Sequence, residues 1–436
     1  MGEVAIPPKI QLRSVVKTSN AILTPDKPTT SPKEPPRHTT MHNHNTPPPD
    51  DSTTFTRTQP HPAVKTSKNM LSPDNLITLP KAHLHLHFTG SLDLATLAEL
   101  AQSAHDKAAA ELINDGALTV PATVKGWFRF QRTYDLARRV VCTEAAMRRV
   151  VQQAARNDAA EGVRRLEIQI DPTSYAPHVG GIIPALEIVL DEAKAAAHAT
   201  GIQVAVIVAA SRMRHPMEAR TLARLASKYA GQGSGEVCGF GLSNDEWAGA
   251  SAEWEGAFRI ARAAGLPGVP HGGELRGADH VRQVVTALHP RRIGHGIRAA
   301  EDPRLVDELV ASQVAFEVCP TSNVQLGIYP RLNAVPLQAL LSAGAQIALG
   351  ADDPLLFHAR LNAQYQAAQQ DMGCNLAQLA ELAASSIRVS FAPDSDKARW
   401  LSEVAFWRTA QLASSQSSPP VIARSVSDEA IQKSNY

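Results

Sequence analysis

Three histidines alternate with apolar residues in the segment HLHLHFTG, which begins at His83 and includes His85 and His87. Residues two apart on a β-strand project from the same face, so His85 and His87 can present two imidazoles to one metal ion. His83 shares that face and is expected one step deeper. An HxH pair is a weak signal by itself, because histidines at this spacing also occur on ordinary strands. The remaining polar residues must therefore be weighed with it.

Further polar side chains follow three later strand-like segments. His271 and Glu274 close the first of these segments, His295 closes the second, and Asp352 and Asp353 close the third. Three imidazoles and one carboxylate are typical of a mononuclear Zn²⁺ site that keeps a position for water. A binuclear site commonly needs a bridging modified lysine after the fourth strand, where this chain reads GLSNDE without a lysine. We therefore predict one Zn²⁺ per chain.

The elements that must position these residues alternate regularly along the chain. Short β-branched segments and longer stretches of helical period follow one another, which is typical of βα units. The expected strands are 82–88, 163–170, 202–208, 237–243, 268–273, 292–296, 314–319 and 346–352. The expected helices include 183–199, 216–230, 251–264 and 302–311, with several extra ones over about 93–161.

Eight such units predict an α/β fold, a (β/α)8 TIM barrel with extra helices inserted after strand 1. A doubly wound parallel sheet is the alternative. In the barrel, the candidate residues meet at the carboxyl ends of the strands, where barrels of this kind place active sites. Residues 1–75 and 413–436 are rich in polar residues and proline, so we expect disordered tails around a barrel domain over 76–412.

The composition argues against several other classes of protein. Lys and Arg number 43 against 42 Asp and Glu, and the resulting net charge of +1 argues against a nucleic-acid binder. No run reaches about 18 apolar residues, so no membrane span is expected, and no secretory signal follows the start. The four cysteines form no CxxC pair, which argues against a disulfide scaffold. We expect a cytoplasmic protein that binds neither nucleic acid nor membranes.

The motifs, in their order, resemble the adenosine deaminase family of metal-dependent hydrolases, a branch of the amidohydrolase superfamily. The resemblance covers about residues 76–412 and rests on KAHLHLHFTG, HGGE, RIGHG, FEVCPTSN and GADDP. It implies one metal-dependent hydrolase barrel with a small purine nucleoside as its partner. The metal ligands that it implies are His85, His87, His271 and Asp352. The HxE and PCxxC signature of the zinc deaminases that act on flipped bases is absent.

The resemblance also implies catalytic roles at the matching positions. Glu274 corresponds to the proton donor to purine N1, and Asp353 to the group that hydrogen-bonds N7. His295 and Asp352 correspond to the residues that orient the attacking water, whose pKa a bound metal lowers from 15.7 to about 7. Glu274 must be protonated to donate, which burial of a carboxyl favours. The expected reaction converts adenosine or 2′-deoxyadenosine to the inosine-type product and ammonia.

Two substrate-binding positions depart from the pattern of the adenosine-specific members, while His87 matches it. Thr89 stands where those members usually carry an acid that meets the ribose hydroxyls. Asn244 stands where glycine is usual, in the loop whose backbone N–H meets purine N3. A 5′-modified adenine nucleoside, such as aminodeoxyfutalosine, and free adenine are therefore alternative substrates. A purine-binding protein without activity and a hydrolase of another amidine or amide, which would not need Glu274, are the alternatives from other classes.

Several of these residues also have structural interpretations. Asp352 and Asp353 are suited to cap a helix before Pro354. Glu317, in FEVCP, is expected to be a buried acid tied to the neighbouring backbone. One aromatic group is interpreted as helix packing, with a wall of the substrate pocket as the alternative; it comprises Trp127, Phe128, Phe130 and Tyr134. The solvated side of the same helix is assigned to Arg129, Arg132, Arg138 and Arg139.

Overall fold

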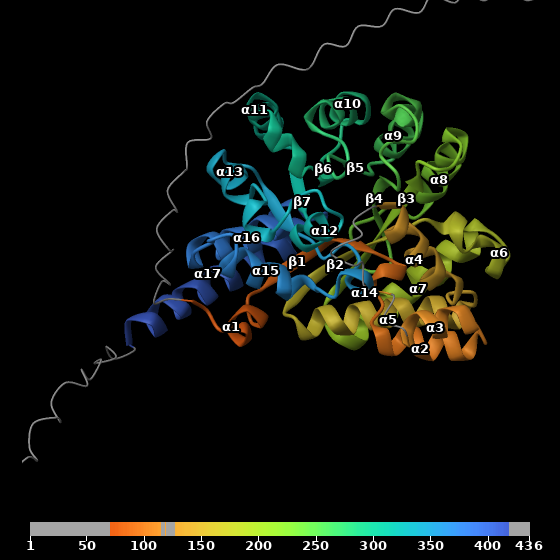
Figure 1. Cartoon of the computed structure of the whole chain (residues 1–436), viewed down its shortest axis with the longest axis horizontal. Helices are drawn as coiled ribbons and strands as arrows, with labels where there is room; N and C mark the ends of the chain where they lie inside the picture. The colour runs from red at the N-terminus through yellow and green to blue at the C-terminus, as the bar shows by residue number, and fades with distance from the viewer. Residues whose placement is uncertain (1–69, 115–117, 119–126, 418–436) are drawn as a thin grey trace, which may run out of the picture. The chain divides into compact units, whose positions relative to one another are not determined.

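Eight parallel strands form the centre of the fold (Figure 1). The computed structural model describes residues 70–114, 118 and 127–417. Neighbouring strands pair in chain order, and the last strand returns to the first through a bridge between Leu86 and Asp352. The strands are β1 (Lys81–His87), β2 (Val163–Ile170), β3 (Gln203–Ser211), β4 (Val237–Ser243), β5 (Gly268–Gly272), β6 (Arg292–His295), β7 (Ala315–Val318) and β8 (Ile347–Leu349). This order confirms the barrel, and the doubly wound alternative, whose strand order reverses, is wrong.

The predicted strands are all present, and β8 is the one that most clearly falls short of its predicted length. The backbone leaves the extended region at the site residues themselves, with φ of +60° at His295 and +61° at Asp352. A left-handed residue cannot continue a strand, and side chains other than glycine adopt this conformation at a cost that functional sites commonly carry. The end of β6 is therefore set by His295 itself, whereas β8 ends at Leu349, three residues before the turn at Asp352.

Helices cover the outside of the barrel (Figure 1). Those that follow strands 2 to 8 include α7 (Ile182–Thr200), α8 (Pro216–Lys228), α9 (Glu255–Ala263), α10 (Ala278–Leu288), α11 (Pro303–Ala311), α13 (Leu337–Ser342) and α16 (Leu376–Val389). Local signals fix their ends; for example, Gly201 stops α7 in a left-handed conformation that a glycine adopts freely. None of the helices among the described residues is long and apolar enough to cross a membrane.

The predicted insertion after the first strand contains four helices within the described residues, namely α2 (Leu94–Ser103), α3 (Lys107–Asn114), α4 (Trp127–Arg139) and α5 (Glu144–Ala160). Thr143 caps α5 by accepting a hydrogen bond from the N–H of Ala146. The insertion places α4 beside the carboxyl end of β1, because α4 contacts the short 3-10 turn Thr89–Ser91.

The folded part of the chain extends further at both ends than the predicted range of 76–412. α1 (Pro73–Ile77) lies inside the segment predicted to be disordered, and α17 (Asp394–Ser417) continues past residue 412. Trp407 of α17 donates a hydrogen bond to the backbone oxygen of Asn75, so the two elements pack on each other. The predictions for 1–69 and 418–436 concern residues outside those that the structure describes.

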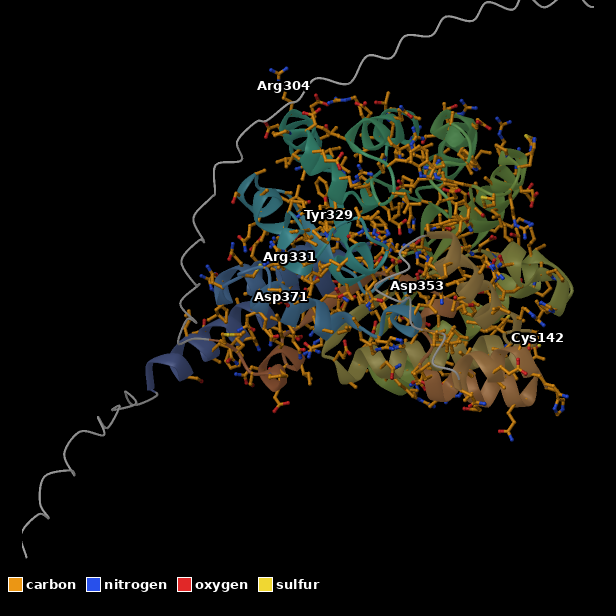
Figure 2. All side chains as sticks on the ribbon, viewed as in Figure 1. Cys142, Arg304, Tyr329, Arg331, Asp353 and Asp371 are labelled. Carbon is orange, nitrogen blue, oxygen red and sulfur yellow. The ribbon has the colours of Figure 1, made fainter. Side chains whose placement is uncertain are left out.

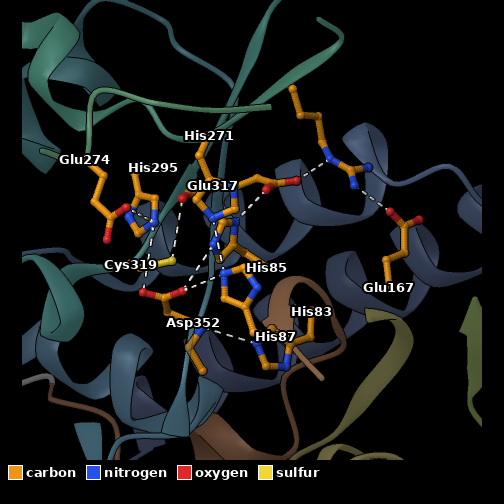
Figure 3. A network of polar contacts seen from close by, with 12 residues as sticks. His83, His85, His87, Glu167, His271, Glu274, His295, Glu317, Cys319 and Asp352 are labelled. Atoms are coloured by element: carbon orange, nitrogen blue, oxygen red, sulfur yellow. Dashed lines mark hydrogen bonds and ion pairs between the residues drawn. The ribbon is translucent and has the colours of Figure 1, made fainter. Parts of the chain in front are cut away.

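The barrel interior combines a small apolar cluster with buried charges. The apolar cluster comprises Ala205, Ile207, Cys238 and Val269, with Phe391 packed against it. Beside it lie four charged residues of alternating sign, which we call the charge ladder: Arg165, Glu167, Arg292 and Glu317. All four are at most 1% exposed, so each depends on its neighbours to offset the loss of water. The ladder leads through the barrel to the carboxyl ends of the strands (Figure 3).

Candidate active site

The four predicted metal ligands meet at the carboxyl end of the barrel (Figure 3). His85 and His87 come from β1, His271 comes from β5, and Asp352 follows β8. The Nε2 atoms of His87 and His271 are 3.2 Å apart, and Asp352 Oδ1 is 3.4 Å from His85 Nε2 and 3.2 Å from His87 Nε2. Ligand atoms at the usual distances from a tetrahedral Zn²⁺ are about 3.3 Å apart, so these three separations suit one such ion. His295 also lies in the donor group, because its ligand atom is within 4.8 Å of those of His85, His271 and Asp352.

The hydrogen bonds of the histidine rings support the same conclusion. His85 Nδ1 lies 2.7 Å from the Glu317 carboxylate, and His271 Nδ1 lies 3.1 Å from the backbone oxygen of Leu242. Both partners only accept, so both rings carry a proton on Nδ1 and leave Nε2 as the atom that can bind a metal. Burial lowers the pKa of His85, but Asp352 and Glu317 outweigh it and raise the pKa to about 10, so a metal would displace the proton on Nε2 to bind its lone pair. His85 Nε2 is buried without a hydrogen-bond partner. Converging lone pairs and a carboxylate are suited to a divalent cation, and the residues present therefore fit a metal.

Close backbone approach makes room for the His85 ring. A Cβ on Gly350 would lie 2.6 Å from His85 Cβ and 2.9 Å from Cys319 Sγ. Any side chain at this position would therefore displace the ligand or the strand that carries it. Asp352 closes the same junction, because its N–H donates to the His85 oxygen and its oxygen accepts from the His87 N–H.

Glu317 supports His85 from behind. Its second carboxylate oxygen accepts a 2.6 Å hydrogen bond from Arg292 Nε, and Arg292 also donates to Glu167 at 2.6 Å. Burial raises the pKa of Glu317, but Arg292 and His85 outweigh that effect and keep the pKa below its usual value. The expectation that Glu317 is tied to neighbouring backbone is wrong; it is bonded to side chains, and it joins the charge ladder to a metal ligand.

His83 does not join the donor group. Its Nδ1 lies 2.9 Å from the Asp158 carboxylate of α5, and its Nε2 accepts from the N–H of Ala351. The register of β1 against β2 shifts between His83 and Leu86. A bulge changes which side chains share a face, so the expectation that His83 shares the face of His85 is wrong.

Glu274 lies at the other side of the metal donors, on the loop after β5. Glu246 holds this loop by accepting hydrogen bonds from the backbone N–H groups of Glu274, Leu275 and Arg276, at 3.0, 2.9 and 2.7 Å. Burial raises the pKa of Glu274 well above its usual value, and the negative charges of Asp352 and Glu246 raise it further. The raised pKa favours the protonated form of Glu274, which is the form that can donate a proton.

His295 and Asp352 are held in complementary charge states. Burial lowers the pKa of His295 to about 4, so its imidazole is neutral at neutral pH and able to accept a proton. Burial raises the pKa of Asp352, but the nearby imidazoles of His85 and His87 outweigh this and hold the pKa well below its usual value. His295 Nε2 lies 3.7 Å from Glu274 Oε2 and 3.9 Å from Asp352 Oδ2. The carboxyl of Glu274, as the acid, and the imidazole of His295, as the base, therefore lie next to each other beside the metal donors.

Asp353 is buried at the start of α14 (Pro354–Phe357) (Figure 2). It occupies the N-cap position but makes no side-chain cap bond, so capping does not account for its carboxyl group. Burial and the neighbouring Asp352 raise its pKa well above the usual value, and its Oδ1 has no hydrogen-bond partner. A Cβ on Gly90 would lie 1.8 Å from that oxygen, which explains the glycine beside it.

The two departures from the family pattern differ in their surroundings. Asn244 lines the cavity with a left-handed φ of +80°, and its Oδ1 accepts from the N–H of Asp245. Asparagine tolerates this conformation better than most residues, so the loop keeps a backbone that glycine would also adopt. Thr89 is fully buried, and its hydroxyl is 2.7 Å from that of Tyr175. It is not among the cavity-lining residues.

A cavity of about 520 Å³ opens above these groups. Six of the predicted site residues line it, together with residues from β2, β3 and α4; the six are His87, Asn244, His271, Glu274, Asp352 and Asp353. The four aromatic residues of α4 also line it, so the interpretation as packing alone is wrong, although Phe130 does stack on Phe357 at 5.2 Å. Arg132 and Arg138 line the cavity as well, in contrast to the predicted solvated side. A larger hollow of about 700 Å³ borders the strand starts and includes no candidate residue.

Three residues of the site were not anticipated from the sequence. Glu246 and Glu317 contact Glu274 and His85 respectively, and Gln169 lines the cavity from β2. Gln169 stands two residues after Glu167 on a buried strand, so its inward direction was open to prediction from the period of the strand. The partners of the two glutamates come from other strands, and no local pattern identifies them.

Comparisons with known proteins agree with this geometry. A family model described as adenosine deaminase matches residues 80–407. A protein of Streptomyces virginiae named "Putative adenosine/adenine deaminase" is 51% identical over 336 residues, which cover 77% of this chain and 98% of that protein. An adenine deaminase of Ralstonia nicotianae is 31% identical, covering 77% of this chain and 97% of that protein.

A solved structure extends the likeness to three dimensions. The crystal structure of an adenine deaminase from Arthrobacter aurescens superposes with a TM-score of 0.69 at 29% identity, covering 76% of this chain and 99% of that one. The match of the family model spans nearly all the described residues, from β1 to α17. The chain belongs to the adenosine deaminase family.

Proposed function

We propose that this protein hydrolytically deaminates an adenine nucleoside, with adenosine or 2′-deoxyadenosine as the leading substrate. One observation carries the proposal: Glu274, whose pKa is raised by burial, lines the same cavity as the metal donors and Asp353. The 6-amino group of adenine leaves only when water attacks C6 and the neighbouring N1 gains a proton. Glu274 is the group that can supply this proton, and hydrolysis of an ordinary amide does not require it.

The metal of the proposal is Zn²⁺, one ion per chain, held by His85, His87, His271 and Asp352. Three imidazoles and one carboxylate are donors that zinc commonly takes, and the separations of their atoms fit its radius. When bound, the metal supplies Lewis acidity that lowers the pKa of a water molecule to about 7.

The chain's own residues then divide the proton transfers. His295, which is neutral, and Asp352, which is anionic, orient the attacking water and take its proton. Glu274 donates its proton to N1, which makes C6 more electrophilic. The raised pKa of Asp353 favours its protonated form, which can donate to N7, an atom that only accepts. The proton taken from water passes to the amine, which leaves C6 as ammonia, and the second water proton returns to Glu274 as the 6-oxo group forms. The products are the inosine-type compound and ammonia, and one water is consumed for each amine released.

The size and polarity of the cavity favour a nucleoside over a bare base. The cavity that holds the metal donors is also lined by Asp171, Ser174 and Arg138, and the scheme above gives none of these polar groups a partner on the adenine ring. Free adenine is the second candidate, and a 5′-modified nucleoside is the third. Two observations favour adenine. Relatives bear the name adenine deaminase, and the hydroxyl of Thr89, at the position expected to contact a ribose, is hydrogen-bonded to Tyr175 instead.

The test is the variant Glu274→Gln, assayed by ammonia release and by the ultraviolet change of the purine. The amide keeps the shape of the side chain but cannot transfer a proton, so we expect turnover to fall about 100- to 10,000-fold. Metal content should stay at the wild-type level, because Glu274 is not a ligand.

Glu218→Gln, on the exposed face of α8, is the matched control and should keep full turnover. Near-normal turnover of Glu274→Gln would refute the role of Glu274. A wild-type protein that carries zinc and binds adenosine but releases no ammonia from any adenine compound would refute the activity itself, and would favour a purine-binding protein instead.

A further inference from the structure

Gln169 stands beside a metal ligand without having a role in the scheme above. It lies on β2, where its Cα partners are His87 on β1 and Ile207 on β3. Glu167, two residues earlier, directs its carboxylate into the barrel to Arg292. Because residues two apart share a face, Gln169 points into the barrel one layer higher, and it lines the active-site cavity.

The amide of Gln169 has no partner on either end. The side chain is 2% exposed, and neither Nε2 nor Oε1 makes a hydrogen bond within the described part of the chain. Buried amides are nearly always paired, because an unpaired donor or acceptor loses its hydrogen bonds to water without replacement. By contrast, Gln131 lines the same cavity, and its Nε2 donates to Asp135 at 2.9 Å. Gln169 is thus prepared for a ligand that carries both a donor and an acceptor.

The order of strands around the barrel indicates which part of the substrate faces Gln169. In the proposed function, N1 lies toward Glu274 after β5, N3 toward Asn244 after β4, and N7 toward Asp353 after β8. The perimeter of a purine runs from N1 through N3 and N9 to N7. The strands run correspondingly from β5 through β4, β3, β2 and β1 to β8. The sector of β2 and β3 therefore faces N9, the atom that bears the sugar of a nucleoside.

The neighbouring residues agree with a sugar in this sector. Thr89 stands at the position where adenosine-specific members were expected to carry a sugar-binding acid. Its hydroxyl is already hydrogen-bonded to the hydroxyl of Tyr175. Beyond Gln169, the cavity wall continues with Asp171 and Ser174, which follow β2. This side of the cavity thus carries several polar groups besides Gln169, whereas an adenine without a sugar would present only N3 and N9–H to it.

We infer that Gln169 is the specificity-determining residue for the sugar, and that its amide hydrogen-bonds a ribose hydroxyl of the nucleoside. A hydroxyl both donates and accepts, so it can satisfy an amide that has neither partner. The inference rests on the proposed function, because the orientation of the ring comes from it. In this proposal the sugar is recognised at the end of β2, by Gln169, and not at the end of β1, where Thr89 lies.

The test compares adenosine with adenine in the variant Gln169→Leu, with kcat/KM measured by ammonia release from the zinc-loaded protein. Leucine has nearly the same size and removes both polar atoms, so loss of one hydrogen bond should lower kcat/KM for adenosine about 10-fold. The value for adenine should change less than about 2-fold, because adenine has no sugar. Gln169→Asn, which retains the amide one methylene further back, should show the same difference and serves if the leucine variant does not fold.

Gln153→Leu, on α5 and outside the cavity lining, is the matched control, since the amide of Gln153 is bonded to Arg149 and Asn157; its ratio of adenosine to adenine activity should equal that of the wild type. Equal losses for both substrates, or none for adenosine, would overturn the inference. A loss confined to adenine would also overturn it and would assign the amide to N9–H. A wild-type protein that deaminates adenine but not adenosine would overturn it while leaving metal-dependent deamination intact. Absence of all deamination would instead refute the proposed function.

Discussion

Replacing Glu317 by glutamine tests how the barrel interior supports the metal site. In the wild-type protein one carboxylate serves two donors, since Oε2 faces His85 Nδ1 at 2.7 Å and Oε1 faces Arg292 Nε at 2.6 Å. Glutamine keeps the shape but has a single oxygen. Whichever donor the oxygen accepts from, the other faces an NH₂ group, and a buried donor without a partner costs about 1–3 kcal/mol.

The metal affinity measures this cost. If the amide turns its oxygen to Arg292, the ring of His85 loses the partner that fixes its tautomer. Loss of such a partner typically weakens metal binding about 10- to 100-fold, which corresponds to about 1.4–2.7 kcal/mol. The cost of an unpaired buried donor and the usual loss of metal-binding free energy are similar in size. We therefore expect Glu317→Gln to bind Zn²⁺ about 10- to 100-fold more weakly than the wild type. Competition with a chromophoric chelator at fixed pH provides the measurement.

Glu167→Gln is the matched control for this experiment. Glu167 also pairs with Arg292 in the charge ladder but touches no ligand, so the variant should be less stable without metal and keep its zinc affinity within about 3-fold. Zinc affinity of Glu317→Gln within 3-fold of the wild type would refute the reasoning. An equal loss of affinity in Glu167→Gln would also refute it, because the effect would then come from the fold as a whole.

Two further predictions concern the loop of Glu274 and the acid stability of the barrel. Glu246→Gln should lower kcat about 10-fold at unchanged zinc content, since an amide cannot accept all three backbone N–H groups that place Glu274; unchanged kcat would contradict this. Burial raises the pKa of Glu167, but Arg292 and Arg165 outweigh it and lower the pKa from 4.5 to about 2. Its contribution of about 3 kcal/mol to folding is therefore complete above pH 4.5 and is lost as the pH falls toward 2. Urea unfolding of the metal-free protein at pH 6 and pH 3 should show a smaller difference for Glu167→Gln than for the wild type, and equal differences would refute this assignment.

The sequence was informative wherever a residue's direction follows from its own strand. His85 and His87 share a face because they are two apart, and His271 and Asp352 reach them because all strand ends of a barrel meet at one rim. The same rule fails at His83, because the bulge between His83 and Leu86 lies in the pairing with β2 and has no signature in the segment itself.

Partners from distant strands were beyond the reach of the sequence. Glu317 lies 232 residues from His85, and nothing near either residue predicts their hydrogen bond. The same holds for Thr89, whose hydroxyl is engaged by Tyr175, 86 residues further along the chain. The types and order of the site residues were thus predictable, whereas the supporting contacts depend on the packed interior.

The junction at Asp352 also bears on the order in which the protein is made. Asp352 bonds the backbone of β1 on both sides, and it supplies a donor to a group whose other members include both histidines of β1. The complete set of donors therefore exists only after the last strand has met the first, a contact that spans most of the chain and forms slowly for that reason. A chain whose synthesis has stopped before β8 has the three histidines but not the carboxylate. With the proposed set of ligands, tight metal binding therefore requires a closed barrel.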